Sequence, residues 1–419
     1  MKKVTAVIIG AGARGRVYAD YAQKHPGELE LAAVAEPDEE RLERYARENQ
    51  IPPEACFQNW EELFSKPKMA DAAIICTMDR MHFEPCLAAI AKGYHILLEK
   101  PMSNDPLECV QMEQAAKEKG VILAVCHVLR YTPFYEKIKE LIESGALGKI
   151  EALQQTEQVC YWHQAHSFVR GNWSRSDETA PMILAKCCHD LDIIAWLMNT
   201  DCTQISSFGS LNHFKAENAP AGAPLRCLDG CQASETCPYY APKLYLTENT
   251  SWPTDTICVD MSLAAREKAL REGPYGRCVY HCDNNVVDHQ TVDMQFANGA
   301  VANLIMTAFS SRMTRTIHIM GTKAELHGDM DACTITLRTF SEEEPVEIPV
   351  VIQQNSAYGH GGGDVALMRD FVLQLQGLGE GRTSAHQSMC SHLMCFAAEE
   401  SRKNGTIIRM NEFIDGFKK

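Results

Sequence analysis

Residues 4–15 read VTAVIIGAGARG, an apolar run of Val and Ile that ends in a turn containing three glycines. The apolar run is typical of a buried strand, and the residues after the turn follow a helical pattern. Gly10 permits a tight turn, Gly12 lets the backbone approach a ligand closely, and Gly15 allows the helix to pack against the strand. The stretch therefore predicts a strand, a turn and a helix whose N-terminus can bind a phosphate group.

The same alternation of short apolar strands and helices continues to residue 126. Further apolar runs lie at 29–35, 72–76, 95–98 and 121–125, with helical patterns between them. Short buried strands that alternate with helices are typical of a parallel, doubly wound sheet. We therefore assign residues 1–126 to an α/β domain of the Rossmann type, which binds dinucleotides.

An acidic residue follows the second predicted strand. Glu36 lies about 20 residues after Gly15, the usual spacing for an acid that binds the ribose hydroxyls of NAD. A carboxylate there repels the 2′-phosphate of NADP, so NADP is the less favoured cofactor, although Arg14 and Arg41 could weaken that preference. The alternative is that Glu36 is only a solvated strand end.

The bulk composition excludes several classes of protein. A chain of 419 residues is too long for one core and predicts at least two domains. The formal net charge of −15 argues against a nucleic-acid partner and against binding to an anionic membrane surface. No run approaches the roughly 20 apolar residues of a membrane span. Most of the 18 cysteines lie in apolar runs, as expected of buried free thiols in the cytoplasm.

The pattern changes after His127, and we assign residues 127–419 to a second, α+β domain. Residues 150–160 resemble a long strand. Alternating stretches later in the chain predict an antiparallel sheet, at 286–296, 300–309, 314–320 and 332–339. Asn298-Gly299 is a hairpin signal between two of them. Helices are expected at 134–144, 181–198, 364–376 and 385–403. Residues 212–285 form a Cys-rich irregular insertion.

A second group of motifs resembles one enzyme family. The sequence Glu99-Lys100-Pro101 follows a strand, and Arg130-Tyr131-x-Pro133 and His189-x-x-Asp192 occur further on. Together with Ala35-Glu-Pro-Asp38 and Cys76-Thr77, they resemble the Gfo/Idh/MocA family of glucose-fructose oxidoreductases and inositol dehydrogenases. The resemblance implies a Rossmann domain followed by an open, mostly antiparallel sheet, one face of which lines the active site. It also implies a nicotinamide cofactor, a sugar or polyol substrate, and a homodimer or homotetramer.

The resemblance further implies the catalytic residues. It places Lys100 beside the nicotinamide and the substrate hydroxyl, where a lysine can transfer a proton. Many relatives carry an Asp four residues before His189, but here that position is Ala185 and Lys186 stands beside it. On one helix Lys186 and His189 would share a face. We expect His189 to act as the base and Lys186 to position the substrate, with a purely structural His189 as the alternative. The expected cofactor contacts are Gly10, Gly12, Ala13, Arg14, Gly15, Glu36, Thr77, His82, Glu99 and Lys100.

One segment is rich in flat side chains that form hydrogen bonds, as suits the ring faces and hydroxyl rim of a sugar. Ordinary packing is an equal alternative for each of these residues. The candidate substrate contacts are Tyr131, Trp162, His163, His166, Arg170 and Trp173, with His360 as a further loop contact.

The cysteines of the insertion form a separate cluster. Cys227, Cys231 and Cys237 lie close together in the sequence, and Cys278 and Cys282 follow. The first three with Cys278 are candidate ligands of a structural zinc ion, although the spacings are irregular and five thiols compete for four places. Packed free cysteines are the alternative.

The motifs, together with the resemblance to this family, therefore imply an NAD-dependent oxidoreductase that acts on a secondary hydroxyl of a sugar, polyol or glycoside. A redox-neutral lyase or glycosidase would use the same residues, oxidising the substrate transiently before elimination and re-reduction. A non-catalytic sensor that binds NAD or a sugar is the third possibility.

Overall fold

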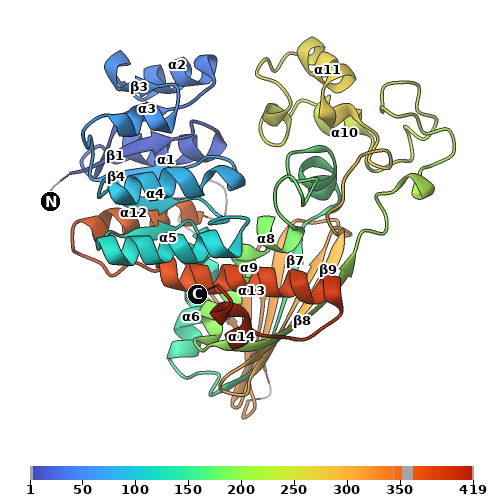
Figure 1. The fold of residues 1–419 in the computed structure, drawn as a ribbon. Helices are drawn as coiled ribbons and strands as arrows, with labels where there is room; N and C mark the ends of the chain where they lie inside the picture. Colours follow the sequence, from blue (N-terminus) through green and yellow to red (C-terminus); the bar gives the residue numbers. More distant parts are fainter. Residues whose placement is uncertain (1–2, 343, 352–361, 418–419) are drawn as a thin grey trace.

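Six parallel strands form the sheet in which the glycine-rich turn lies, in the order β3-β2-β1-β4-β5-β6 (Figure 1). The computed structural model describes residues 3–342, 344–351 and 362–417. This doubly wound order confirms the predicted Rossmann sheet. The strands are β1 (Val4–Ile9), β2 (Leu29–Ala35), β3 (Cys56–Phe57), β4 (Ala72–Ile75), β5 (His95–Leu98) and β6 (Leu123–Val125).

The helices between these strands begin and end as their sequences dictate. The carboxylate of Asp38 accepts a hydrogen bond from the Arg41 N–H at the start of its helix, and Asp105 caps another. Gly120 ends the latter helix in the left-handed conformation, with φ of 68°. The helices are α1 (Ala13–Lys24), α2 (Glu39–Glu48), α3 (Trp60–Ser65), α4 (Phe83–Ala91) and α5 (Pro106–Lys119).

A second, nine-stranded sheet has the order β14-β13-β12-β11-β7-β10-β9-β8-β15. Only β7 and β10 run parallel among its neighbouring strands in the described residues, which confirms a mostly antiparallel sheet. The strands are β7 (Ile150–Gln158), β8 (Cys202–Ser210), β9 (His289–Phe296), β10 (Val301–Thr307), β11 (Thr314–Gly321), β12 (Ala324–Asp329), β13 (Thr334–Thr339), β14 (Val346–Ile348) and β15 (Ile408–Arg409).

The C-terminal helices contact both the Rossmann domain and the large sheet. Helix α13 (Ala385–Asn404) lies between α5 and the large sheet, and α12 (Gly363–Leu375) contacts α1 (Figure 1). One apolar core runs through all of these elements. The division into domains of 1–126 and 127–419 therefore stays a prediction. The remaining helices of the large sheet are α6 (Pro133–Glu143), α8 (Met182–Ala185), α9 (Cys188–Met198) and α14 (Met410–Asp415).

The insertion contains short helical segments and little regular structure. Helices α10 (Ala241–Tyr245) and α11 (Leu263–Glu272) lie on the opposite side of the upper part of the molecule from α2 and α3 (Figure 1). Before the insertion, α7 (Tyr161–His163) continues into a π-helical segment at Gln164–Arg170. Two small apolar clusters are separate from the main core: one packs the insertion against this segment, and the other lies within the insertion.

The helix expected at 181–198 is broken. The chain leaves the helical path after α8 and re-enters it at α9, so Lys186 and Cys187 belong to neither helix. Lys186 has φ of −112°, and its ammonium turns toward Glu157 of β7. The prediction that Lys186 and His189 lie on one helix is therefore wrong. The apolar run hid the break because both halves are buried.

A buried ion pair joins the segment after β6 to helix α9. The guanidinium of Arg130 donates two hydrogen bonds of 2.7 Å to the carboxylate of Asp192 on α9. Both residues are almost fully buried. Burial raises the pKa of Asp192, but the charges of Arg130 and His127 outweigh it, and the pKa lies below its usual value.

We predict that Arg130→Met lowers the free energy of unfolding by about 3–5 kcal/mol, because it leaves a buried carboxylate without its partner. Arg271→Met is the matched control, since Arg271 forms an exposed helical pair with Glu267; its cost should stay below about 0.5 kcal/mol. Urea denaturation measures both. A loss in Arg130→Met no larger than the control's would contradict the assignment.

We also predict a loss of stability in mild acid that depends on His392. Its ring accepts a hydrogen bond from the Met102 N–H and donates one to the Ser388 carbonyl, and burial followed by the charge of His127 lowers its pKa to about 3. In the unfolded chain the His392 ring is protonated below about pH 6.5, so above that pH the free energy of unfolding is not reduced by its protonation. This free energy falls by about 1.4 kcal/mol per pH unit as the pH drops toward the folded pKa.

His392→Gln should reduce the slope of unfolding free energy against pH between pH 6 and 4, because glutamine does not titrate there. His386→Gln, on the exposed side of the same helix, is the control and should keep the wild-type slope. Equal slopes for His392→Gln and the wild type would show that His392 does not carry the effect.

Candidate active site

The glycine-rich turn is closed toward the protein and open toward solvent. A Cβ atom at Gly10 would lie 2.7 Å from the Cys76 carbonyl oxygen, and one at Gly15 would lie 2.3 Å from that of Gly10. Apart from its neighbours in the chain, no atom lies within 4 Å of a Cβ atom placed on Gly12, so the space beside Gly12 can hold a ligand. Helix α1 starts at Ala13 without a side-chain cap and without an acid in its first turn. Its N–H groups and dipole therefore suit a pyrophosphate.

Glu36 lies beside this turn. Its carboxylate accepts hydrogen bonds from the Ala11 N–H (2.8 Å) and the Asp38 N–H (3.1 Å), and the guanidinium of Arg41 is 3.4 Å away. The side chain is buried at the C-terminal end of β2, as the motif requires. Glu36 thus holds the turn and also places a negative charge at the strand end.

A buried network connects the turn to the Glu-Lys-Pro motif. The carboxylate of Glu99 accepts hydrogen bonds from Arg14 Nε (2.5 Å) and from the hydroxyl of Tyr18. Arg14 also contacts Asp364 of α12 at 2.6 Å. Burial raises the pKa of Glu99, but Arg14 and the Tyr18 hydroxyl outweigh it and hold the pKa below its usual value. Arg14 and Glu99 therefore have a clear structural role in addition to any contact with a cofactor.

Thr77 and His82 shape the neighbouring loop. The Thr77 hydroxyl donates to the Met81 carbonyl (2.9 Å). The fully buried His82 ring has one nitrogen 2.7 Å from the Pro101 carbonyl and the other 3.1 Å from that of Thr77. His82 thus links the loop after β4 to the loop after β5, where the Lys100–Pro101 peptide bond is cis.

Lys100 lies in the wall of a cavity of about 680 Å³, whose other lining residues all come from the chain after residue 128. Its ammonium donates a hydrogen bond to the Ala185 carbonyl at 3.2 Å. The cavity has the size of a site for a small ligand. Among the lining residues, the charged and aromatic ones that bear on chemistry are Lys100, Lys186, Arg315, His163, Trp173 and Trp252.

A charged cluster next to the inner face of the large sheet contributes two residues, Lys186 and Arg315, to the lining of this cavity. The ammonium of Lys186 lies 3.5 Å from Glu157, whose carboxylate also contacts Arg315 at 2.6 Å. Arg315 also contacts Asp190 at 2.8 Å. Burial lowers the pKa of Lys186, Glu157 acts in the opposite direction, and the charges of Arg315 and Lys100 lower it further. A lowered pKa favours the neutral amine, which is the form of a lysine that can accept a proton.

Sequence reasoning missed Glu157 and Arg315. Both lie on neighbouring strands, β7 and β11, at positions that alternate onto the inner face. A charged residue at a buried position of an alternating strand was the available signal.

His189, in contrast, is not among the residues that line the cavity. It is buried on α9, with its ring centroid 6.0 Å from that of His127. The structure therefore brings Lys100 and Lys186 to one cavity, whereas His189 is buried and is not among the lining residues.

The candidate substrate residues divide into two groups. His163 and Trp173 line the cavity, and the Trp173 indole donates to Asp79 at 3.0 Å. The other four do not line it: Trp162 packs on Trp252, and Tyr131, His166 and Arg170 are buried in other contacts. The Tyr131 hydroxyl pairs with Asp370, the His166 ring with the Tyr245 hydroxyl, and the Arg170 guanidinium with two carbonyls of the insertion. His360 lies outside the described residues.

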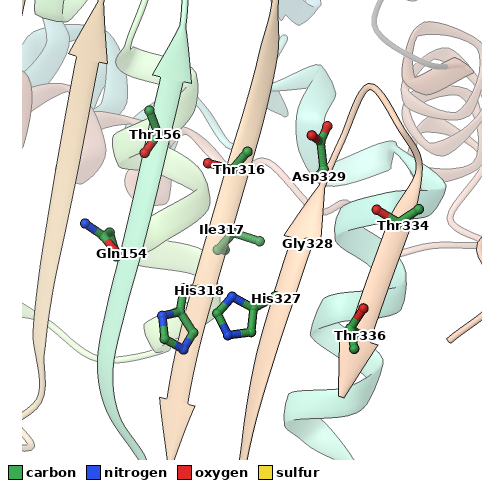
Figure 2. Close-up of a pocket in the computed structure, with 10 residues that line it drawn as sticks. All are labelled: Gln154, Thr156, Thr316, Ile317, His318, His327, Gly328, Asp329, Thr334 and Thr336. Atoms are coloured by element: carbon green, nitrogen blue, oxygen red, sulfur yellow. The ribbon is translucent and has the colours of Figure 1, made fainter. Parts of the chain in front are cut away.

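A second hollow, of about 400 Å³, lies on the outer face of the large sheet (Figure 2). His318 of β11 and His327 of β12 stand side by side there, with ring centroids 3.8 Å apart. Glu325 joins them, and the potential ligand atoms of these three residues lie within 4.8 Å of one another. The hollow is lined by residues on the face opposite to Glu157 and Arg315, so it is separate from the Lys100 cavity.

Within the described residues, no helix is both long enough and apolar enough to cross a membrane.

Comparison with known proteins agrees with this geometry. Residues 4–127 match the family described as oxidoreductases with an NAD-binding Rossmann fold, and residues 135–327 match the GFO/IDH/MocA C-terminal domain. A Bacillus subtilis protein named as an oxidoreductase, YteT, is 23% identical over 74% of this chain and 73% of its own length.

Two further proteins are similar. Inositol 2-dehydrogenase 4 of Saccharopolyspora erythraea is 29% identical over 51% of this chain, and the match spans only 59% of its length. A levoglucosan dehydrogenase solved with NADH and levoglucosan superposes with a TM-score of 0.73 at 18% identity, over 98% of this chain and all of that one. The two matched domains, in this order and over most of the chain, place the protein in the Gfo/Idh/MocA family of oxidoreductases.

Proposed function

We propose that the protein is an NAD-dependent oxidoreductase that acts on a secondary hydroxyl of a sugar, polyol or glycoside. The observation that carries the proposal is the position of Lys100. It follows the Rossmann strand β5 and lies in the wall of the cavity that Lys186 and Arg315 also line. A group at the C-terminal end of a Rossmann strand stands where the fold presents a dinucleotide.

The cavity wall suits a hydroxylated ring. Trp173 and Trp252 offer flat apolar faces, while Lys100, Lys186 and Arg315 offer hydrogen-bond donors. The inositol and levoglucosan dehydrogenases named above support a substrate of this class.

The residues of the chain would divide the chemistry as follows. Bound NAD would accept the hydride. Lys100 would hold the reacting hydroxyl, and Lys186 would take its proton, because burial lowers the pKa of Lys186 and so favours the neutral amine. Glu157 and Arg315 would position Lys186. The geometry thus favours Lys186 over His189 as the base, since Lys186 lines the cavity and His189 does not.

We predict that Lys100→Met and Lys186→Met each lower turnover by about 10²–10⁴-fold while NAD binding survives. Activity should rise with pH as the base loses its proton, and this limb of the pH–rate profile should flatten in Lys186→Met. Lys92→Met, at an exposed lysine of the Rossmann domain, is the control and should keep the wild-type profile.

His189→Asn separates the two candidate bases. If this variant flattens the limb and Lys186→Met does not, His189 is the base and the role given to Lys186 is wrong. Near-normal turnover in both lysine variants would remove the proposed site. Release of the leaving group from an aryl glycoside without added NAD would instead support the redox-neutral lyase.

The cofactor preference depends on Glu36. We predict that NAD binds more tightly than NADP, because the Glu36 carboxylate stands at the strand end that faces the ribose. Glu36→Ala should reduce the ratio of the two dissociation constants, and Glu39→Ala, in the exposed first turn of α2, should leave it unchanged. Fluorescence titration with each cofactor measures the ratio. A wild-type preference for NADP of tenfold, about 1.4 kcal/mol, would refute this role of Glu36.

A further inference from the structure

Four cysteines of the insertion surround one very small cavity. Cys227, Cys231, Cys237 and Cys278 all line it, and its volume is about 10 Å³. That is room for one water-sized occupant. The structure also answers which four of the five neighbouring thiols belong together, because Cys282 is not among the lining residues.

Backbone contacts bring the distant cysteine to the other three. The Cys227 N–H donates to the Gly276 carbonyl, and the Cys278 N–H donates to the Leu225 carbonyl, both at 2.9 Å. These bonds flank an isolated antiparallel bridge between Arg226 and Arg277. Cys227 and Cys278 are therefore held beside each other by a two-stranded contact rather than by the thiols themselves.

A buried cation beside the cluster calls for a negative charge. Arg170 is 3% exposed, and its guanidinium donates to the Arg277 and Tyr239 carbonyls at 2.7 and 2.6 Å. It also lies 3.7 Å from the sulfur of Cys227. Within the described part of the chain, no ion pair joins Arg170 to a carboxylate. A buried charge is costly unless a counter-charge lies near it, and thiolates would supply one.

The sulfur of Cys227 also has the surroundings of a metal ligand. The Ala241 N–H points at it from 3.5 Å, and Arg170 approaches from another side. Donors of this kind stabilise a thiolate and orient it toward a metal.

We propose that Cys227, Cys231, Cys237 and Cys278 bind a structural zinc ion in the insertion. Binding would release the four thiol protons to solvent and leave a centre of net negative charge beside Arg170. In the structure the four thiols line the cavity without meeting at ligand distance. Among the described residues, the potential metal ligands whose atoms do lie within 4.8 Å of one another are His318, Glu325 and His327, in the outer hollow. The proposal therefore includes contraction of the four side chains to a Zn–S distance of about 2.3 Å.

Such an ion would stabilise a segment that has little else to hold it. Cys227 belongs to one of the two small apolar clusters of the insertion and Cys278 to the other, so the ion would join them. The same segment carries Trp252 into the wall of the Lys100 cavity. The zinc would be structural, since its ligands do not line that cavity.

The test is the zinc content of the full chain, purified without chelator and measured by mass spectrometry. We expect about one zinc per chain in the wild type. Cys227→Ser and Cys278→Ser should lose it. Cys282→Ser is the matched control and should retain it, because Cys282 does not line the cavity and its thiol donates to the Cys278 carbonyl at 3.3 Å. Cobalt in place of zinc should give the absorption bands of a tetrahedral thiolate site.

If the serine variants do not fold, the zinc site is tested on the wild-type protein. Titration with a thiol-reactive mercurial should release the zinc, and its removal should lower the melting temperature while NAD binding remains. A wild type without zinc overturns the proposal. So does zinc that survives Cys227→Ser but is lost in His327→Gln, which would place the metal in the outer hollow. Either failure leaves the proposed oxidoreductase function intact.

Discussion

The buried carboxylate of Glu99 is the contact on which the arrangement of the site depends. It accepts hydrogen bonds from Arg14 at the start of α1, from Tyr18 one turn later, and from the N–H of Lys100 (3.0 Å). Arg14 extends the network to Asp364 of α12. One carboxylate thus fixes the N-terminus of α1 relative to Lys100 in the cavity wall. Because a buried charge tolerates no loss of its partners, this geometry is held more rigidly than loops usually are.

The parallel half of the fold could be predicted because its signals are local. Each of its longer strands is a short apolar run. The glycine-rich turn marks where the first strand ends and the first helix begins. The two-residue strand β3 escaped, since two residues carry no periodicity. In the large sheet, β8, β12, β14 and β15 were also missed. Their side chains alternate between a covered and an open face, and several are too short or too polar to stand out.

The candidate site was only partly predictable, for a related reason. Lys100 and the glycines act next to their own strand ends, so sequence and space agree. Glu157 and Arg315 meet only because β7 and β11 pair, and no local pattern reveals that pairing. The break between α8 and α9 was also missed. A largely apolar run predicts one helix, yet the chain turns at Lys186, whose ammonium lies 3.5 Å from Glu157 of β7.

The aromatic residues before and within the insertion show how a general scaffold acquires a particular pocket. His166 and Arg170 resemble sugar contacts in the sequence, but both are buried against the insertion and hold it in place. What they hold includes Trp252, whose ring packs edge-on against His163 and His166, with centroids 5.1 and 5.8 Å apart. Since this segment has little secondary structure, the position of Trp252 depends on those side-chain contacts. The part of the cavity wall that Trp252 forms is therefore set by the insertion, and a different insertion on the same two sheets would present a different pocket.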